Sequence, residues 1–73
     1  MATISKNISE TIADNINDKL DVRGWTAYRL WKEVGGSKTS TYNVCCGKYE
    51  PSAGLLRDIA KALDCTMDAL VKE

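Results

Sequence analysis

Histidine is absent from the 73 residues of this chain. Histidine is the commonest general base in enzymes and a frequent metal ligand, so its absence removes both options. The sequence also lacks a nucleophile–base pair, a set of metal-ligating residues and a glycine-rich loop that could hold a phosphate. We therefore expect no catalysis, no metal, no other cofactor and no small-molecule ligand.

Cysteine occurs three times, and its spacing matches no known framework. Cys45 and Cys46 are adjacent, and Cys65 stands alone. An odd number of cysteines with this spacing fits neither a zinc site nor a set of paired disulfides. Unpaired thiols are typical of a reduced, cytosolic protein. We therefore expect three small, half-buried, reduced side chains.

Long apolar stretches are also missing. No run approaches the roughly 18–20 residues that a membrane span needs, and the first ten residues lack the apolar region of a secretory signal. Hydrophobic residues make up 44% and charged residues 27%, the balance of an ordinary globular protein. We expect a cytoplasmic protein with no membrane partner, folded as a single domain over residues 1–73 around one compact core.

Charge of one sign is not in excess, since ten basic residues balance ten acidic ones. The distribution is uneven, however. Residues 1–22 and 49–73 each carry a net charge of −2. Residues 23–48 carry +4, because five basic side chains stand against Glu33: Arg23, Arg29, Lys32, Lys38 and Lys48. A basic segment between acidic flanks indicates a surface that faces a polyanion.

The apolar residues recur at helical spacing, and no alternating strand pattern occurs. The spacing predicts five short helices and an all-α fold. In the first, one stripe faces inward, Asn7 and Glu10 form a capping box and Gly24 ends the helix. That stripe consists of Ile8, Ile12, Ile16 and Leu20.

Four further residues are predicted N-caps of the following helices: Thr26, Ser37, Ser52 and Thr66. The helix after Thr26 should turn Ala27, Leu30, Trp31 and Val34 inward, which gives Trp31 a role in the core. The helix over residues 38–46 should bury one side and expose the other. Its buried side comprises Thr41, Val44 and Cys45.

Two of these helices are separated only by Gly35, Gly36 and Ser37, which is the geometry of a helix-turn-helix unit. Residues 25–35 resemble the first half of this motif in the phage-repressor and Cro-like bacterial transcriptional regulators, the xenobiotic-response-element type. Residues 37–44 resemble its recognition helix. Residues 47–48, 51–52, 59–63 and 67–70 resemble the loop and last two helices of the same family. The resemblance implies a compact five-helix, lambda-repressor-like DNA-binding domain, with its motif at residues 26–46.

The resemblance places helix 38–46 in the major groove of double-stranded DNA, with its exposed side chains at base edges. Lys38 can donate to guanine, and Asn43 can pair with adenine through two hydrogen bonds. Thr39 can exchange hydrogen bonds and touch a thymine methyl group, and Tyr42 is long enough to reach a base or a phosphate. The resemblance also implies phosphate contacts from six residues: Thr26, Tyr28, Arg29, Ser37, Lys48 and Ser52.

Two positions depart from the family pattern. Ala27 stands where the family usually has a glutamine that orients another contact, so that interaction is lost. Thr41 stands where the family usually has a branched apolar residue, and its buried hydroxyl then needs a backbone carbonyl. Both departures affect base preference and leave the expected fold unchanged.

The expected function is sequence-specific DNA binding by a transcriptional regulator, most simply a repressor, in a bacterial or phage-infected cell. A weak homodimer, formed through the last helix, would read a palindromic operator. Met67, Leu70 and Val71 supply apolar residues for this contact, although the core also needs some of them. The alternative is a protein-binding module of the same fold, such as an antitoxin-like partner or a phage anti-regulator. The zero net charge and the missing glutamine support that alternative.

Overall fold

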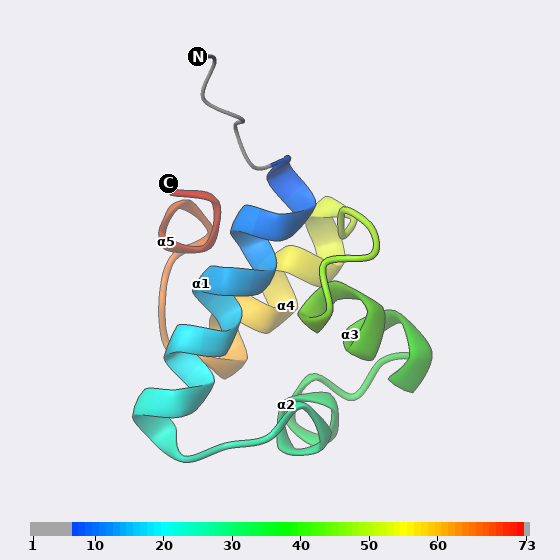
Figure 1. Ribbon diagram of the computed structural model, residues 1–73. Helices are drawn as coiled ribbons and strands as arrows, with labels where there is room; N and C mark the ends of the chain where they lie inside the picture. The colour runs from blue at the N-terminus through cyan, green and yellow to red at the C-terminus, as the bar shows by residue number, and fades with distance from the viewer. Residues whose placement is uncertain (1–6, 73) are drawn as a thin grey trace.

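Five α-helices make up the architecture of residues 7–72, the part of the chain that this computed structural model describes (Figure 1). In chain order they are α1 (Ile8–Arg23), α2 (Ala27–Val34), α3 (Lys38–Cys45), α4 (Ala53–Ala62) and α5 (Met67–Val71). No strand occurs in the described residues, so the all-α prediction is confirmed. The expected single domain over 1–73 includes residues 1–6 and 73, which lie outside the described part.

The predicted caps are present at the start of every helix. The Asn7 side chain accepts a hydrogen bond from the Glu10 backbone at 2.9 Å, and the Glu10 carboxylate accepts one from the Asn7 backbone at 3.4 Å. At the other four N-termini, a hydroxyl accepts from the backbone N–H three residues on, at 3.1–3.3 Å. Each cap satisfies a backbone donor that has no partner inside its helix. The third helix ends at Cys45, one residue earlier than predicted.

The core forms where α1 packs on α3 and α5, while α2 and α5 pack on α4 and α2 also contacts α3. Its fully enclosed apolar residues come from all five helices and from the turn after α4: Ile16, Leu30, Val44, Ile59, Leu63 and Leu70. The stripe predicted for α1 is confirmed at Ile12, Ile16 and Leu20, each at most 3% exposed. Ile8 is the exception, at 36% exposed. It is the first residue of α1 and lies at the rim of the core, so its neighbours cover only part of it.

Three polar side chains link helices that are distant in sequence. The Asn17 amide donates to the carbonyls of Ala13 and Cys45, and so joins α1 to the end of α3. The Asn15 amide donates to carbonyls at the C-terminal end of α5, and the Arg23 guanidinium donates to Leu63 at the end of α4. Helix C-termini leave carbonyls without intrahelical partners, and these side chains satisfy some of them. The spacing of these three residues in the sequence does not predict this role.

Candidate nucleic-acid interface

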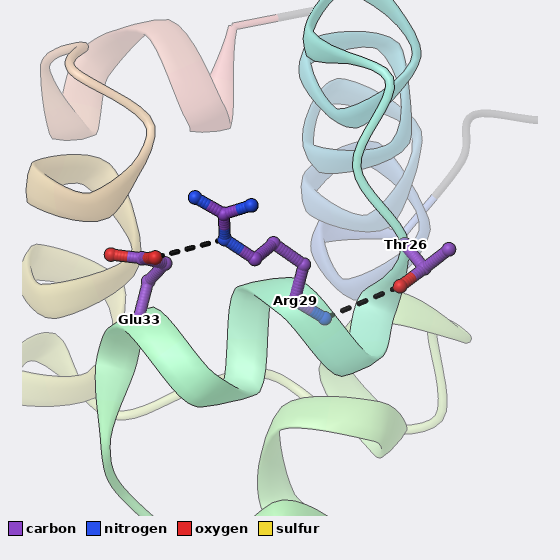
Figure 2. Close-up of polar contacts among 3 residues, drawn as sticks. All are labelled: Thr26, Arg29 and Glu33. Atoms are coloured by element: carbon purple, nitrogen blue, oxygen red, sulfur yellow. Dashed lines mark hydrogen bonds and ion pairs between the residues drawn. The ribbon is translucent and has the colours of Figure 1, made fainter.

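The N-terminus of α2 begins the candidate interface. Thr26 is exposed, and its hydroxyl accepts a hydrogen bond from the Arg29 backbone at 3.3 Å (Figure 2). The first backbone N–H groups of a helix lack intrahelical partners and, with the helix dipole, attract anions. Tyr28, 50% exposed, adds a hydroxyl in this first turn. Thr26 and Tyr28 therefore lie together at a helix end suited to a phosphate.

Arg29 already has partners within the protein. Its Nε donates to the Glu33 carboxylate at 2.9 Å, one turn along α2 (Figure 2). Its guanidinium carbon also lies 4.4 Å from the centre of the Trp25 ring. In Figure 2 the contact with Glu33 is made by Nε, so the N–H groups of the other two guanidinium nitrogens can still donate hydrogen bonds. Glu33 nevertheless neutralises this charge locally, which weakens Arg29 as a phosphate contact relative to the lysines nearby.

The third helix separates a buried side from an accessible side, as the sequence predicts. Thr41, Val44 and Cys45 are buried. The four predicted base-contacting residues lie on the accessible side: Lys38 and Thr39 are exposed, while Tyr42 and Asn43 are half-buried. The cap residue Ser37 is exposed at the start of this helix. The helix thus presents the four side chains together on one rigid element.

A cluster of two lysines and three aromatic rings joins α2 to α3. We call it the lysine–aromatic cluster, and it consists of Tyr28, Trp31, Lys32, Lys38 and Tyr42. The rings of Tyr28 and Trp31 meet edge to face, with their centres 5.4 Å apart. Each ammonium lies within about 6 Å of ring centres, the range in which a cation is attracted to an aromatic face. The cluster places two positive charges at the junction between α2 and the start of α3.

Trp31 does not lie in the core, and the sequence prediction for it is wrong. The side chain is half-buried at the α2–α3 surface, and its indole Nε1 donates to the Gly36 carbonyl at 2.8 Å. Helical spacing does put Trp31 next to Leu30 and Val34 on α2, but a buried indole N–H needs an acceptor. Trp31 donates to Gly36 in the exposed turn before α3, and that hydrogen bond holds the ring at the surface. Aromatic and basic residues three and four positions apart, Tyr28 with Trp31 and Lys32, were the signal for this cluster.

The last two predicted phosphate contacts lie beyond α3. Lys48 is exposed, and its backbone N–H donates to the Asn43 carbonyl at 2.9 Å, which fixes the start of the loop to the end of α3. Ser52 is exposed and caps α4, with its hydroxyl accepting from Leu55 at 3.2 Å. The loop between them positions the N-terminus of α4 after the end of α3. These two residues therefore extend the interface away from α2.

The buried hydroxyl of Thr41 departs from expectation. The side chain is fully enclosed, and its Oγ1 has no hydrogen-bond partner within residues 7–72. The backbone carbonyl that the sequence analysis expected to satisfy it is not in place. Thr41 N–H donates to the Ser37 carbonyl in the first turn of α3, and the Thr41 hydroxyl does not share that acceptor. Burial without a partner leaves the desolvation cost of this hydroxyl uncompensated.

Replacing Thr41 with valine should therefore stabilise the protein. The change keeps the branched shape and removes the unpaired hydroxyl, so we expect a gain of about 1 kcal/mol, or roughly 4–8 °C in Tm. Thermal unfolding followed by circular dichroism measures this. Thr39→Val is the matched control, because Thr39 is exposed on the same helix and its Tm should change little. An unchanged or lower Tm for Thr41→Val would show that the hydroxyl is hydrogen-bonded in solution.

All three cysteines are free, as predicted, but their environments differ. Cys45 is buried, Cys46 is exposed and Cys65 lies between these extremes. Burial, reinforced by the neighbouring Cys46, raises the pKa of Cys45 from 9.0 to about 11. Burial also raises the pKa of Cys65, against the opposing effect of nearby Lys19 and Arg23. Because the thiolate is the reactive form, these shifts lower the reactivity of Cys45 and Cys65.

Alkylation of the native protein with iodoacetamide should label Cys46 first, Cys65 more slowly and Cys45 last. The raised pKa alone lowers the thiolate fraction of Cys45 at neutral pH by about a hundredfold, and its burial adds to the delay. The rate for Cys45 should rise with pH up to about 11. Fragment masses assign each label, and in denaturant the three rates should converge. Equal native rates at Cys45 and Cys46 would contradict this ordering.

Residues 7–72 contain neither a metal-binding cluster nor a membrane-spanning helix. No group of three or more acidic or cysteine side chains there is arranged to hold a metal ion. Among these residues no helix combines the length and apolar character needed to cross a lipid bilayer. In comparisons with known proteins, no family model, no curated protein and no solved structure matches this chain.

Proposed function

We propose that this protein is a sequence-specific, double-stranded DNA-binding regulator, most simply a repressor, of the phage-repressor and Cro-like helix-turn-helix class. In this proposal α2, the turn at residues 35–37 and α3 form the helix-turn-helix. The recognition helix α3 enters the major groove in the cytoplasm of a bacterial or phage-infected cell. The observation that carries the proposal is the two-sided character of α3. Its buried side anchors it in the core, and its other side presents four hydrogen-bonding side chains.

The distribution of charge supports a polyanionic partner. Lys32, Lys38 and Lys48 are all exposed on α2, α3 and the loop that follows. Exposed acidic residues lie mainly on α1, at Glu10, Asp14, Asp18 and Asp21, and from α4 to α5, at Asp58, Asp64 and Asp68. Such an asymmetry gives the protein a preferred orientation toward DNA despite its zero net charge. We propose that Thr26, Tyr28, Ser37, Lys48 and Ser52 hold the phosphates, with a smaller contribution from Arg29.

We also propose that the protein acts as a weak homodimer through α5. A symmetric dimer would hold two recognition helices about 34 Å apart, which matches one turn of DNA. Leu70 is fully enclosed in the core, so only the partly exposed Met67 and Val71 remain for a partner. This small apolar area is consistent with weak association that DNA tightens. Sedimentation that shows a strict monomer, both free and on its preferred duplex, would overturn the dimer.

The direct test is to incubate the protein with a pool of random duplexes and sequence those it retains. We expect an enriched palindrome whose half-sites lie about one helical turn apart. Lack of enrichment, even at low salt and high protein concentration, would overturn DNA recognition. The second candidate would then be a protein-binding module. The partly exposed rings of the lysine–aromatic cluster favour it, because aromatic residues are enriched where proteins meet.

A further inference from the structure

Three aromatic rings surround the ammonium group of Lys38. Its Nζ lies 5.6 Å from the centre of the Trp31 ring, 5.7 Å from that of Tyr42 and 6.0 Å from that of Tyr28. Two of these rings come from α2 and one from α3. Each contact is weak at an exposed site, but all three act on the same ammonium. The side chain of Lys38 is therefore drawn toward the α2–α3 junction.

The ring of Trp31 is itself held in place. Its Nε1 donates to the Gly36 carbonyl at 2.8 Å, and its ring packs against that of Tyr28 at an interplanar angle of 63°. Gly36 belongs to the turn that leads into α3, and Lys38 is the first residue of that helix. A single hydrogen bond thus fixes the ring relative to the helix that carries Lys38. The indole is the one member of the cluster that both touches Lys38 and is tied to the connecting turn.

We propose that Trp31 is a positioning residue for Lys38, holding its ammonium at one place so that it meets DNA as an ordered donor. This inference rests on the proposed DNA-binding function. A free lysine loses much rotamer freedom when an interface immobilises it, and a side chain ordered in advance loses less. An ammonium held at the α2–α3 junction also reaches fewer bases than one that moves freely. Trp31 therefore contributes to affinity and base preference without itself reading a base.

The positioning can be tested on the free protein by nuclear magnetic resonance. Ring currents should move the side-chain methylene protons of Lys38 upfield relative to those of Lys61, which is exposed on α4. In Trp31→Leu these protons should move toward the Lys61 values, whereas Trp31→Phe, which keeps a ring but loses the N–H that donates to Gly36, should keep only part of the shift. Lys38 protons that match Lys61 in the unaltered protein would overturn the positioning. This measurement needs no DNA.

The consequence for binding can be tested on the duplex that the random pool enriches. Trp31→Leu should weaken binding by about two- to tenfold and relax the preference at the base pair that Lys38 reads. In a Lys38→Met background the same change should have no further effect. An equal loss in both backgrounds would overturn the coupling and leave Trp31 as a purely structural residue. Circular dichroism establishes that each variant is folded.

Two variants serve as matched controls. Trp25→Leu removes the other tryptophan, whose ring lies against Arg23 and Arg29, so its effect should be independent of Lys38. Lys32→Met removes the second ammonium of the cluster and should leave base preference unchanged. If no duplex is enriched, the proposed function fails and the DNA role of Trp31 fails with it. The methylene shifts still decide separately whether Trp31 positions Lys38.

Discussion

Replacing Leu30 with alanine should lower the free energy of unfolding by about 2–5 kcal/mol. Leu30 is fully enclosed, and it is the one buried residue of α2. Truncation removes apolar contacts and leaves a cavity that the surrounding helices can fill only in part. Because α2 packs on both α3 and α4, the loss would loosen the connection of α2 to the rest of the core.

Chemical denaturation measures this loss, and two variants calibrate it. A domain of this size has a total stability of roughly 4–11 kcal/mol, so Leu30→Ala can unfold outright. Leu30→Met keeps the side-chain volume and should cost less than about 1.5 kcal/mol. Val22→Ala removes apolar atoms from a residue that is 88% exposed, and should change stability by less than about 0.5 kcal/mol. Equal stability of Leu30→Ala and Val22→Ala would remove Leu30 from the core.

The features that were predictable from sequence are local ones. An N-cap hydrogen bond joins residues only three apart in the sequence. A capping residue that directly precedes helically spaced apolar residues therefore marks the start of a helix without knowledge of the fold. All five caps were found in this way, from Asn7 to Thr66. Gly24 and Gly35 end their helices at φ values of +70° and +78°, which glycine adopts without steric cost. The buried and accessible sides of α3 are likewise predicted by the helical spacing of its residues.

The features that were missed depend on contacts between helices. Spacing puts Trp31 on the same stripe as Leu30, but only the turn beyond α2 provides an acceptor for its N–H. Similarly, Asn15 and Asn17 are ordinary polar residues of a helix until α5 and α3 bring unpaired carbonyls to them. Asparagine is a poor helix former, and two in one helix interior were a weak signal of such a role. The sequence indicates that a buried hydroxyl at Thr41 needs an acceptor, but only the folded structure shows that it has none within residues 7–72.

Replacing Asn43 with alanine should weaken binding to the preferred duplex by about 1–3 kcal/mol and relax the preference at one base pair. Asn43 lies half-buried on the accessible side of α3, and its side-chain amide makes no hydrogen bond within residues 7–72. The amide can therefore offer both its donor and its acceptor to an adenine. Its backbone carbonyl is held by Lys48, so the helix end that carries it is fixed. Titration of the enriched duplex and of its single-base variants measures the change.

Lys48→Ala should have effects opposite to those of Asn43→Ala on base preference and salt dependence. Comparison of the two variants therefore distinguishes a base contact from a phosphate contact. Lysine contributes a charge, and its loss should weaken binding to every duplex alike and reduce the slope of log K against log salt by about one. Asn43→Ala removes no charge, so its salt slope should stay unchanged while its base preference relaxes. If Asn43→Ala instead weakened all duplexes equally, Asn43 would be a general contact and α3 would lose one of its proposed readers. If Lys48→Ala altered the preferred sequence, its role at the phosphate backbone would be wrong. Asn43 lies in the last turn of α3 and Lys48 lies just beyond its end, so together the two variants establish how this end of α3 is oriented on DNA.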